Sequence, residues 1–192
     1  MLGFNVHGAT LGIIGLGKIG TAVARRARGF NMKILYYNRS RNRHLESELG
    51  AKYAVLEDLL AKSDFVSIHA SLNNASYHLI DRSKLKLMKK TAFLINTARG
   101  QIVNEADLTK ALRSSQIAGV ALDVFEEEPL AKTSPLLKMK NAVLLPHIGS
   151  ATYQTRSQMA EVAATNLLDV LNRKKPNHRF LVNPEVMIVR SL

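Results

Sequence analysis

Short apolar runs alternate along the chain with segments whose apolar residues recur every three or four positions. Short runs are typical of strands that are buried on both faces, and the wider spacing is typical of helices that cover a sheet. The pattern predicts strands at 10–14, 33–37, 65–69, 92–96, 119–124 and 142–145, and helices at 18–28, 56–61, 85–88, 106–112 and 153–171. This alternation predicts an α/β fold with a doubly wound parallel sheet.

Two of the predicted helices carry further signals. Asn104 precedes the helix at 106–112 and Asp107 follows three positions later, which is the spacing of a reciprocal cap. The last helix places its apolar residues on one face: Met159, Val162, Ala163, Leu167 and Val170. The segment 173–192 contains Pro176 and Pro184 and is typical of a linker.

The first predicted strand runs directly into the motif Gly15-Leu16-Gly17-Lys18-Ile19-Gly20. Gly15 permits a tight turn, Gly17 lets the backbone approach a pyrophosphate, and Gly20 lets the following helix pack against the strand. The amides and the dipole at the helix start favour the charge of the phosphates. Between a strand and a helix, the motif indicates a Rossmann-type dinucleotide-binding domain. The alternative is that these glycines only turn the chain.

The end of the second predicted strand carries Asn38, Arg39 and Ser40. NAD-binding domains place an acidic residue there, about 20 residues beyond the glycine motif, where it binds the ribose hydroxyls. Asn38 does not repel a 2′-phosphate, and Arg39 and Ser40 bind one through charge-assisted hydrogen bonds. We therefore expect NADP as the cofactor, with NAD as the alternative. The basic turn 39–43 also fits a solvated surface without a ligand.

Three more polar segments each follow a predicted strand. They are Asn96-Thr97-Ala98-Arg99-Gly100, Asp123-Val124-Phe125-Glu126-Glu127-Glu128-Pro129 and Pro146-His147-Ile148-Gly149-Ser150-Ala151. Ligands of an open parallel sheet bind beyond the carboxyl ends of the strands. We therefore expect the three segments to converge beside the glycine motif.

With four motifs in this order and spacing, the sequence resembles the D-isomer-specific 2-hydroxyacid dehydrogenases over nearly its whole length. The resemblance implies that Arg99, Glu128 and His147 are the catalytic residues. The matching glutamate is the one that precedes the proline, so Glu126 and Glu127 are expected to be surface residues.

The implied roles suit the reduction of a 2-keto acid, in which hydride transfer leaves negative charge on the carbonyl oxygen. As an imidazolium, His147 donates a hydrogen bond to this oxygen and then protonates it. Glu128 stabilises the charged imidazole and fixes its tautomer. Arg99 polarises the carbonyl and binds the substrate carboxylate with its planar guanidinium.

The resemblance also implies further contacts with the cofactor. It places His69 on the adenine side and Asp123 near the nicotinamide ring or its carboxamide. Four residues are expected to place their backbone near the nicotinamide half: Thr97, Ala98, Gly149 and Ser150. We expect no metal site.

The charge balance is strongly basic, with 27 Lys and Arg against 15 Asp and Glu and a net charge of +12. The basic residues are spread over the chain without interleaved aromatic residues, so we expect no nucleic-acid partner. No apolar stretch reaches the length of a membrane span, and we expect no membrane partner. The chain has no cysteine, which favours a reducing compartment, and we expect the cytoplasm.

Members of the family begin with a separate substrate domain that closes over the ligand and excludes water. Here the first predicted strand begins at residue 10, so we expect that domain to be largely absent from this chain. The resemblance then implies a dinucleotide-binding domain at 1–172 and, at 173–192, a tail that returns to the absent domain. We expect either a fragment of a longer protein or a shortened gene product.

Two classes of function fit these observations. The first is an NADP-linked oxidoreductase that interconverts a small 2-keto acid, such as glyoxylate or hydroxypyruvate, and the D-2-hydroxy acid. The second is a module that binds NAD(P) without turnover, or an interaction protein that senses the nucleotide. We also expect a homodimer that forms through this domain.

Overall fold

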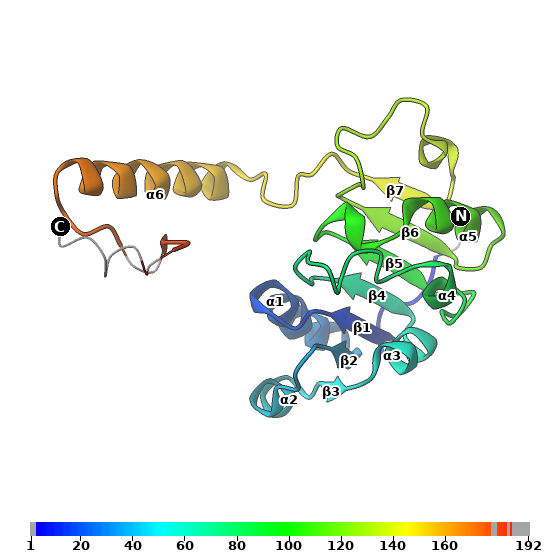
Figure 1. The fold of residues 1–192 in the computed structure, drawn as a ribbon. Helices are drawn as coiled ribbons and strands as arrows, with labels where there is room; N and C mark the ends of the chain where they lie inside the picture. The colour runs from blue at the N-terminus through cyan, green and yellow to red at the C-terminus, as the bar shows by residue number, and fades with distance from the viewer. Residues whose placement is uncertain (1–2, 178–179, 184, 186–192) are drawn as a thin grey trace. The chain divides into compact units, whose positions relative to one another are not determined.

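The structure, a computed structural model, describes residues 3–177, 180–183 and 185. The chain forms two compact units, Met1–His147 and Ile148–Leu192. The described part of the first unit contains a seven-stranded parallel sheet (Figure 1). Its strands are β1 (Thr10–Ile14), β2 (Lys33–Tyr37), β3 (Lys52–Tyr53), β4 (Phe65–Ile68), β5 (Phe93–Asn96), β6 (Gly119–Leu122) and β7 (Ala142–Leu144).

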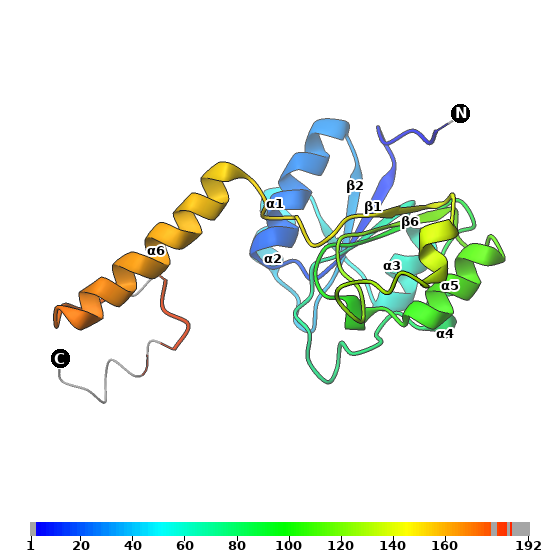
Figure 2. The same cartoon turned by 90° about the horizontal axis from the view of Figure 1, so that it is seen from above.

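Helices cover both faces of this sheet, as Figure 2 shows. One face carries α1 (Lys18–Ala27) and α2 (Arg43–Leu49). The other face carries α3 (Leu56–Lys62), α4 (Arg82–Leu85) and α5 (Glu105–Arg113). The described part of the first unit also contains three short 3-10 helices in its connections: η1 (Arg28–Phe30), η2 (Gly100–Ile102) and η3 (Pro135–Lys138).

The strand order is β3-β2-β1-β4-β5-β6-β7. The chain builds outward from β1 through β2 and β3, and then returns to place β4 on the other side of β1. Ile14 of β1 is in register with Tyr37 of β2 and Ile68 of β4, so these three strands end at the same level. Such a reversal opens a crevice beyond the carboxyl ends of the strands. The predicted doubly wound parallel sheet is confirmed.

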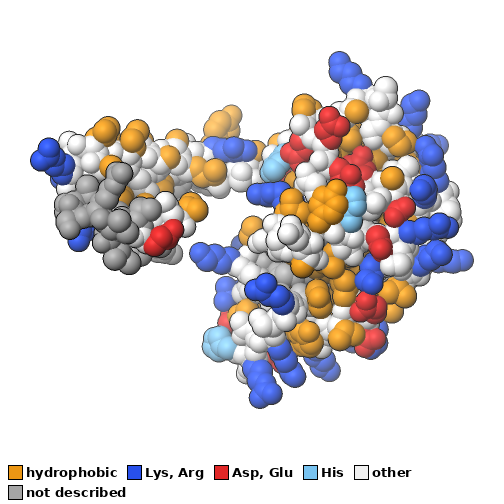
Figure 3. Space-filling view, in the orientation of Figure 1, with side chains coloured by type: hydrophobic (Ala, Val, Ile, Leu, Met, Phe, Trp, Pro, Cys, Tyr) orange, Lys and Arg blue, Asp and Glu red, His pale blue; other side chains and the backbone are white. Residues whose placement is uncertain are grey.

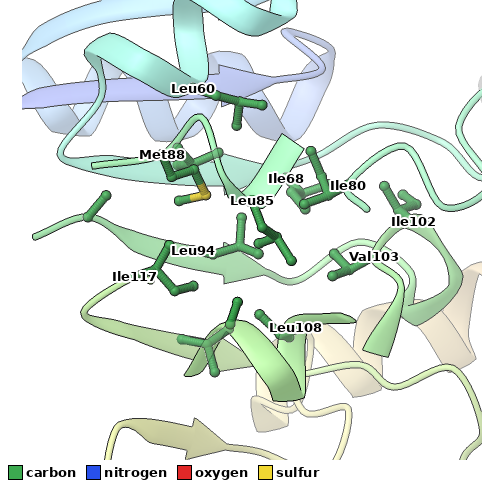
Figure 4. Packing of buried hydrophobic residues seen from close by; sticks show 14 of the residues in the cluster. Leu60, Ile68, Ile80, Leu85, Met88, Leu94, Ile102, Val103, Leu108 and Ile117 are labelled. Atoms are coloured by element: carbon green, nitrogen blue, oxygen red, sulfur yellow. The ribbon is translucent and has the colours of Figure 1, made fainter. Parts of the chain in front are cut away.

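The larger hydrophobic cluster lies between the sheet and α3, α4 and α5 (Figure 4). Leu60, Leu85 and Leu108 come from these three helices. They pack with Ile68 of β4 and Leu94 of β5, and each of the five side chains is at most 1% exposed. Burial of one such side chain is worth about 1.5–3 kcal/mol relative to its exposure. The cluster therefore fixes the central strands from whose ends the candidate site extends.

A second cluster lies on the opposite face, beneath α1 and α2. Ala24 and Ala27 of α1 are buried together with Ile13 of β1 and Ile34 of β2. Alanine at the buried positions leaves little side chain between the helix and the sheet. The start of α1 is thereby held directly beyond the end of β1, at the glycine motif.

Most predicted elements are confirmed to within two residues, and the helix predicted at 153–171 coincides with α6 (Tyr153–Leu171) in the second unit. None of the residues of α6 is buried. Leu167 of the predicted apolar face is 61% exposed and Val170 is 45% exposed. The division of the chain after residue 172 stays a prediction, and Pro184 of the predicted tail lies outside the described residues.

Besides the three 3-10 helices, one described α-helix and one described strand were not predicted, and one helix was misplaced. The unpredicted α-helix is α2 and the unpredicted strand is β3. The helix predicted at 85–88 lies instead at Arg82–Leu85, because the side chain of Asp81 accepts a hydrogen bond of 3.0 Å from the Lys84 N–H and starts the helix there.

The reciprocal cap at Asn104 is half confirmed. Its side chain accepts a hydrogen bond of 2.9 Å from the Asp107 N–H, as predicted. The return bond was wrong, because the Asp107 carboxylate accepts from the Arg82 N–H (3.1 Å) and the Asn104 N–H donates to the Ile80 carbonyl (2.9 Å). Asp107 thus joins α4 to α5.

Lysine and arginine side chains are scattered over the face shown in Figure 3 and form no single continuous stripe there. Within the described part of the chain, no helix has both the length and the apolar character that a bilayer span needs.

Candidate active site

A cleft of about 420 Å³ lies beyond the carboxyl ends of β1, β2 and β4. It is lined by the glycine loop, by the turn after β2 and by the segment after β4. Seven of the predicted cofactor residues line it: Gly15, Leu16, Gly17, Asn38, Arg39, Ser40 and His69. The glycine motif, the turn after β2 and His69 are therefore brought together at the switch point of the sheet. No residue of the segments 96–100, 123–129 and 146–151 is among the described residues that line this cleft, so their convergence beside the glycine motif stays a prediction.

The glycine loop has the geometry that its sequence predicts. Gly15 has φ +98, and a Cβ atom added to it would lie 2.6 Å from the Ala70 nitrogen. A Cβ at Gly20 would collide with the carbonyl oxygen of Gly15. A Cβ at Gly17 would meet nothing within 4 Å, so the chain is open toward the cleft at this residue. This open backbone fits the close approach of a dinucleotide pyrophosphate.

The start of α1 is free to receive an anion. Its N-cap residue, Gly17, has no side chain to cap the helix, and the first turn carries no acidic residue. Lys18 and Ile19 are exposed in this turn, and Gly20 is buried. Uncapped N–H groups at a helix start, with the positive end of the helix dipole, bind phosphate oxygens.

The turn after β2 is attached to the glycine loop through Asn38. The side-chain oxygen of Asn38 accepts a hydrogen bond of 2.7 Å from the Leu16 N–H, and its carbonyl oxygen accepts one of 3.5 Å from the Tyr53 hydroxyl. Arg39 and Ser40, the next two residues, are exposed. Asn38 therefore fixes the point from which Arg39 and Ser40 extend.

His69 lies in the cleft just beyond the end of β4. Its Nε2 makes a hydrogen bond of 2.8 Å with the hydroxyl of Ser67. Burial lowers the pKa of His69, which favours the neutral imidazole at neutral pH. The side chain therefore adds a polar but uncharged surface to the cleft.

Arg99 is held by the side chain of Asn96, at the end of β5. The Asn96 amide oxygen accepts from the Ala98 N–H (3.1 Å), and its amide nitrogen donates to the Arg99 carbonyl (2.9 Å). The Arg99 guanidinium is exposed and donates to the Ala98 carbonyl at 2.6 Å. No role was predicted for Asn96, although an asparagine at the end of a strand is a known signal for such a side-chain turn.

His147 and Glu128 form a pair. Nδ1 of His147 donates to Oε2 of Glu128 at 2.8 Å, and Oε1 of Glu128 accepts from the Phe125 N–H at 3.1 Å. Partial burial acts to raise the pKa of Glu128, but the hydrogen bonds from His147 and Phe125 and the charges of His147 and Arg99 lower it overall. Glu128 is therefore ionised at neutral pH and fixes the imidazole tautomer.

Apolar surface lies beside this pair. A cavity of about 580 Å³ is lined by Phe125, Glu128, Pro129, Leu130, Leu137, Leu144, Leu145, Pro146 and His147. Its walls are mostly hydrocarbon, and the Glu128 carboxylate next to such walls is less screened than one in open water.

Glu126 was expected at the surface and is half-buried there, with 33% of its side chain exposed, whereas Glu127 is exposed as expected. Oε1 of Glu126 accepts a hydrogen bond of 2.7 Å from the Glu105 N–H at the start of α5, and it lies 3.0 Å from Nε2 of His78. Its carbonyl oxygen accepts from the side chain of Gln101 at 2.8 Å. Glu126 thus ties the segment between Asp123 and Glu128 to two other connections.

The remaining predicted residues occupy three places. Thr97 is exposed and Ala98 half-buried in the turn after β5. Asp123 is buried beyond β6, and its N–H donates to the Asn96 carbonyl at 3.0 Å. Gly149 and Ser150 belong to the second unit. The cofactor contacts of these five residues stay predictions.

The fold and the glycine loop define the class of the protein, a nicotinamide dinucleotide-binding domain. The chain belongs to the D-isomer specific 2-hydroxyacid dehydrogenase family, whose NAD-binding-domain model matches residues 1–149. It is 54% identical over 191 residues to a glyoxylate reductase of Aeropyrum pernix, covering 100% of this chain and 56% of that protein.

Two more relatives are also named as glyoxylate reductases. A glyoxylate reductase of Korarchaeum cryptofilum is 52% identical over 190 residues, covering 99% of this chain and 57% of that protein. The crystal structure of a glyoxylate reductase from Paecilomyes thermophila superposes with a TM-score of 0.81 at 44% identity, covering 88% of this chain and 51% of that one. The chain therefore spans a little over half the length of the curated relatives it matches.

Proposed function

We propose that this chain is the cofactor-binding part of an NADP-dependent reductase that converts a small 2-keto acid, glyoxylate or hydroxypyruvate, to the D-2-hydroxy acid. The observation that carries the proposal is the 2.8 Å bond between His147 and Glu128, with the charge of Arg99 close enough to act on Glu128. The names of the glyoxylate reductase relatives support the choice of substrate.

The residues of this chain supply binding and proton transfer. When bound, the dihydronicotinamide supplies a hydride to the carbonyl carbon of the substrate. Nδ1 of His147 donates its hydrogen bond to Glu128, so the proton on Nε2 is the one given to the carbonyl oxygen. Arg99 binds the substrate carboxylate and polarises the carbonyl. One hydride and one proton together complete the alcohol.

The cofactor would be held by the cleft at the end of β1. The amides at the start of α1 receive the pyrophosphate, and the open backbone at Gly17 leaves room for it. Arg39 and Ser40 would receive a 2′-phosphate, because both are exposed on the cleft and no acidic residue stands at Asn38. We therefore favour NADP over NAD.

Turnover tests the catalytic assignment. We expect the purified protein to oxidise NADPH in the presence of glyoxylate or hydroxypyruvate. His147→Gln should lower kcat by about 10²–10⁴-fold with unchanged NADPH affinity, because it removes only the proton donor. His44→Gln, at an exposed position of α2, is the control and should change neither. NADPH binding without turnover would support the alternative, a module that binds the nucleotide only.

Fluorescence titration with NADPH and NADH tests the cofactor assignment. We expect tighter binding of NADPH, and Arg39→Gln should remove most of the difference by weakening NADPH alone. Arg26→Gln, at an exposed position of α1, is the control with the same change of charge. Tighter binding of NADH by the unaltered protein would overturn the assignment to NADP.

The setting of the reaction completes the proposal. A chain of 192 residues without cysteine fits a reducing compartment, and we propose the cytoplasm. We also propose a homodimer, which a mass measured by light scattering would test. A monomeric mass across the working concentration range would contradict it.

A further inference from the structure

A buried tyrosine lies beneath the turn that follows β2. Tyr36 is 0% exposed, yet its hydroxyl has two partners. It donates to Oε1 of Glu46 at 2.7 Å and accepts from the Asn42 N–H at 2.8 Å. A hydroxyl in a hydrophobic core must keep its hydrogen bonds, so these bonds attach the far end of the turn and the helix α2 to the sheet.

The same glutamate binds Arg41 with both of its oxygens. Nε of Arg41 donates to Oε1 of Glu46 and Nη2 donates to Oε2, each at 2.7 Å. This bidentate bond lowers the pKa of Glu46 to about 2, so the carboxylate stays charged. Arg41 is not among the described residues that line the cleft. Its guanidinium is thus bonded to α2.

Arg39 and Ser40 lie between two fixed points. On one side, Asn38 is bonded to the Leu16 N–H of the glycine loop at 2.7 Å. On the other, the Asn42 N–H is bonded to the Tyr36 hydroxyl. Among the ion pairs recorded for the described chain, none includes Arg39. The turn is therefore held at both ends by hydrogen bonds. Arg39, between these ends, lines the cleft without an acidic partner.

We propose that Tyr36, Glu46 and Arg41 are positioning residues for cofactor specificity: they hold the turn 38–42 in the shape that presents Arg39 and Ser40 to a nucleotide 2′-phosphate. A turn that is ordered before binding loses no conformational freedom when the phosphate arrives, so preorganisation raises affinity. The three residues act through the turn and do not touch the nucleotide. This inference rests on the proposed function, because it takes NADP as the cofactor.

Tyr36→Phe tests the inference without a change of charge. Loss of the hydroxyl frees one end of the turn. We expect the Kd for NADPH to rise about three- to tenfold, as for the loss of one or two hydrogen bonds. NADH lacks the 2′-phosphate, so its Kd should stay within about twofold, and this also shows that the fold is intact. Fluorescence titration of both nucleotides gives the two constants.

Glu46→Gln and Arg41→Gln distinguish positioning from direct contact. If Arg41 only positions the turn, both variants weaken NADPH binding. If Arg41 were a ligand of the phosphate, Glu46→Gln would release it and tighten binding, and that result overturns the inference. Glu48→Gln is the matched control, because Glu48 lies on the same helix and pairs with Arg25. It measures the effect of one lost negative charge by itself.

The outcomes separate the inference from the proposed function. If the unaltered protein binds NADPH more tightly than NADH and Tyr36→Phe keeps the same preference, the inference is overturned but the assignment to NADP stands. Equal affinities of the unaltered protein for NADPH and NADH overturn the assignment to NADP, and the inference with it. NADPH affinity that falls for Tyr36→Phe and Glu46→Gln, but not for Glu48→Gln, supports both.

Discussion

Gly100 lies where two parts of the candidate active site touch. It follows Arg99 directly, and a Cβ atom at this residue would collide with the backbone of Phe125 and Glu126. The Phe125 N–H in turn holds the carboxylate of Glu128. The distance between Arg99 and the pair of Glu128 and His147 is therefore set by backbone packing at a glycine.

Gly100→Ala is the substitution that tests this packing. We expect the free energy of unfolding to fall by about 1–3 kcal/mol or more, because one of two backbone segments must move. Gly29→Ala is the control, since a Cβ at Gly29 meets nothing within 4 Å, and it should change stability by less than about 1 kcal/mol. Urea unfolding measures both. Equal losses would show that the contact at Gly100 is easily relieved.

Glu126 and Glu127 form a natural pair for comparison. Glu126→Ala removes the acceptor of the Glu105 N–H and the partner of His78, so we expect a loss of about 1–3 kcal/mol in the free energy of unfolding. Glu127 is exposed, and Glu127→Ala should stay within about 0.5 kcal/mol. Thermal melts of both variants measure this. A neutral Glu126→Ala would mean that water replaces its partners.

At the residue scale, the sequence predicted contacts within a motif better than contacts between motifs. The hydrogen bond from the Asp107 N–H to Asn104 and the close approach of Gly20 to the Gly15 carbonyl join residues within a few positions, and both agree with the predicted local geometry. The contacts of Glu126 were not predicted, because its partners, Glu105 and His78, come from other connections. Tertiary partners of a half-buried carboxylate leave no mark on its local pattern.

At the scale of an element, α2 shows why a short helix is hard to predict from the sequence. It has only two apolar residues, Leu45 and Leu49, so its periodicity is weak. Its ends are clearly marked, because the Asn42 side chain accepts from the Leu45 N–H at 3.1 Å and Gly50 ends the helix with φ 66. Those two end signals could have predicted it. The two residues of β3 are different, because their pairing with β2 defines them.

Acid should weaken the attachment of α2. The folded state lowers the pKa of Glu46 from 4.5 to about 2, first through its hydrogen bond with Arg41. Its stabilising contribution is therefore complete well above pH 4.5 and is lost as the pH falls from there toward 2. We expect thermal unfolding midpoints, compared at about pH 6 and about pH 3, to fall less for Glu46→Gln than for the unaltered protein.

At the scale of the whole molecule, the net charge of +12 attracts anionic ligands. A 2′-phosphate adds nearly two negative charges, so the Kd for NADPH should rise more steeply with salt concentration than the Kd for NADH. Raising the ionic strength from about 0.05 M to about 0.5 M shortens the screening length and should narrow the ratio of the two Kd values several-fold. Titrations at constant pH measure this. Equal salt dependence for both nucleotides would contradict a phosphate contact.

The whole fold was more predictable than any single boundary. Six of the seven strands were predicted from continuous apolar runs, which parallel strands form when both of their faces are buried. Of these six, β7 has such a run although none of its residues is buried. The glycine motif then located β1, and with it the switch point. Burial within the second unit could not be predicted from the sequence, because α6 has an apolar face and yet buries none of its residues.

His147 follows β7, a three-residue strand that pairs only with β6 among the described strands and exposes 61% of Val143. Amide hydrogens in such a marginal strand exchange with solvent at a lower opening free energy than those of the central β1 and β4. On warming, we expect β7 to open before the central strands β1 and β4 and to take the imidazole away from Glu128. Inactivation would therefore precede the melting of the central sheet.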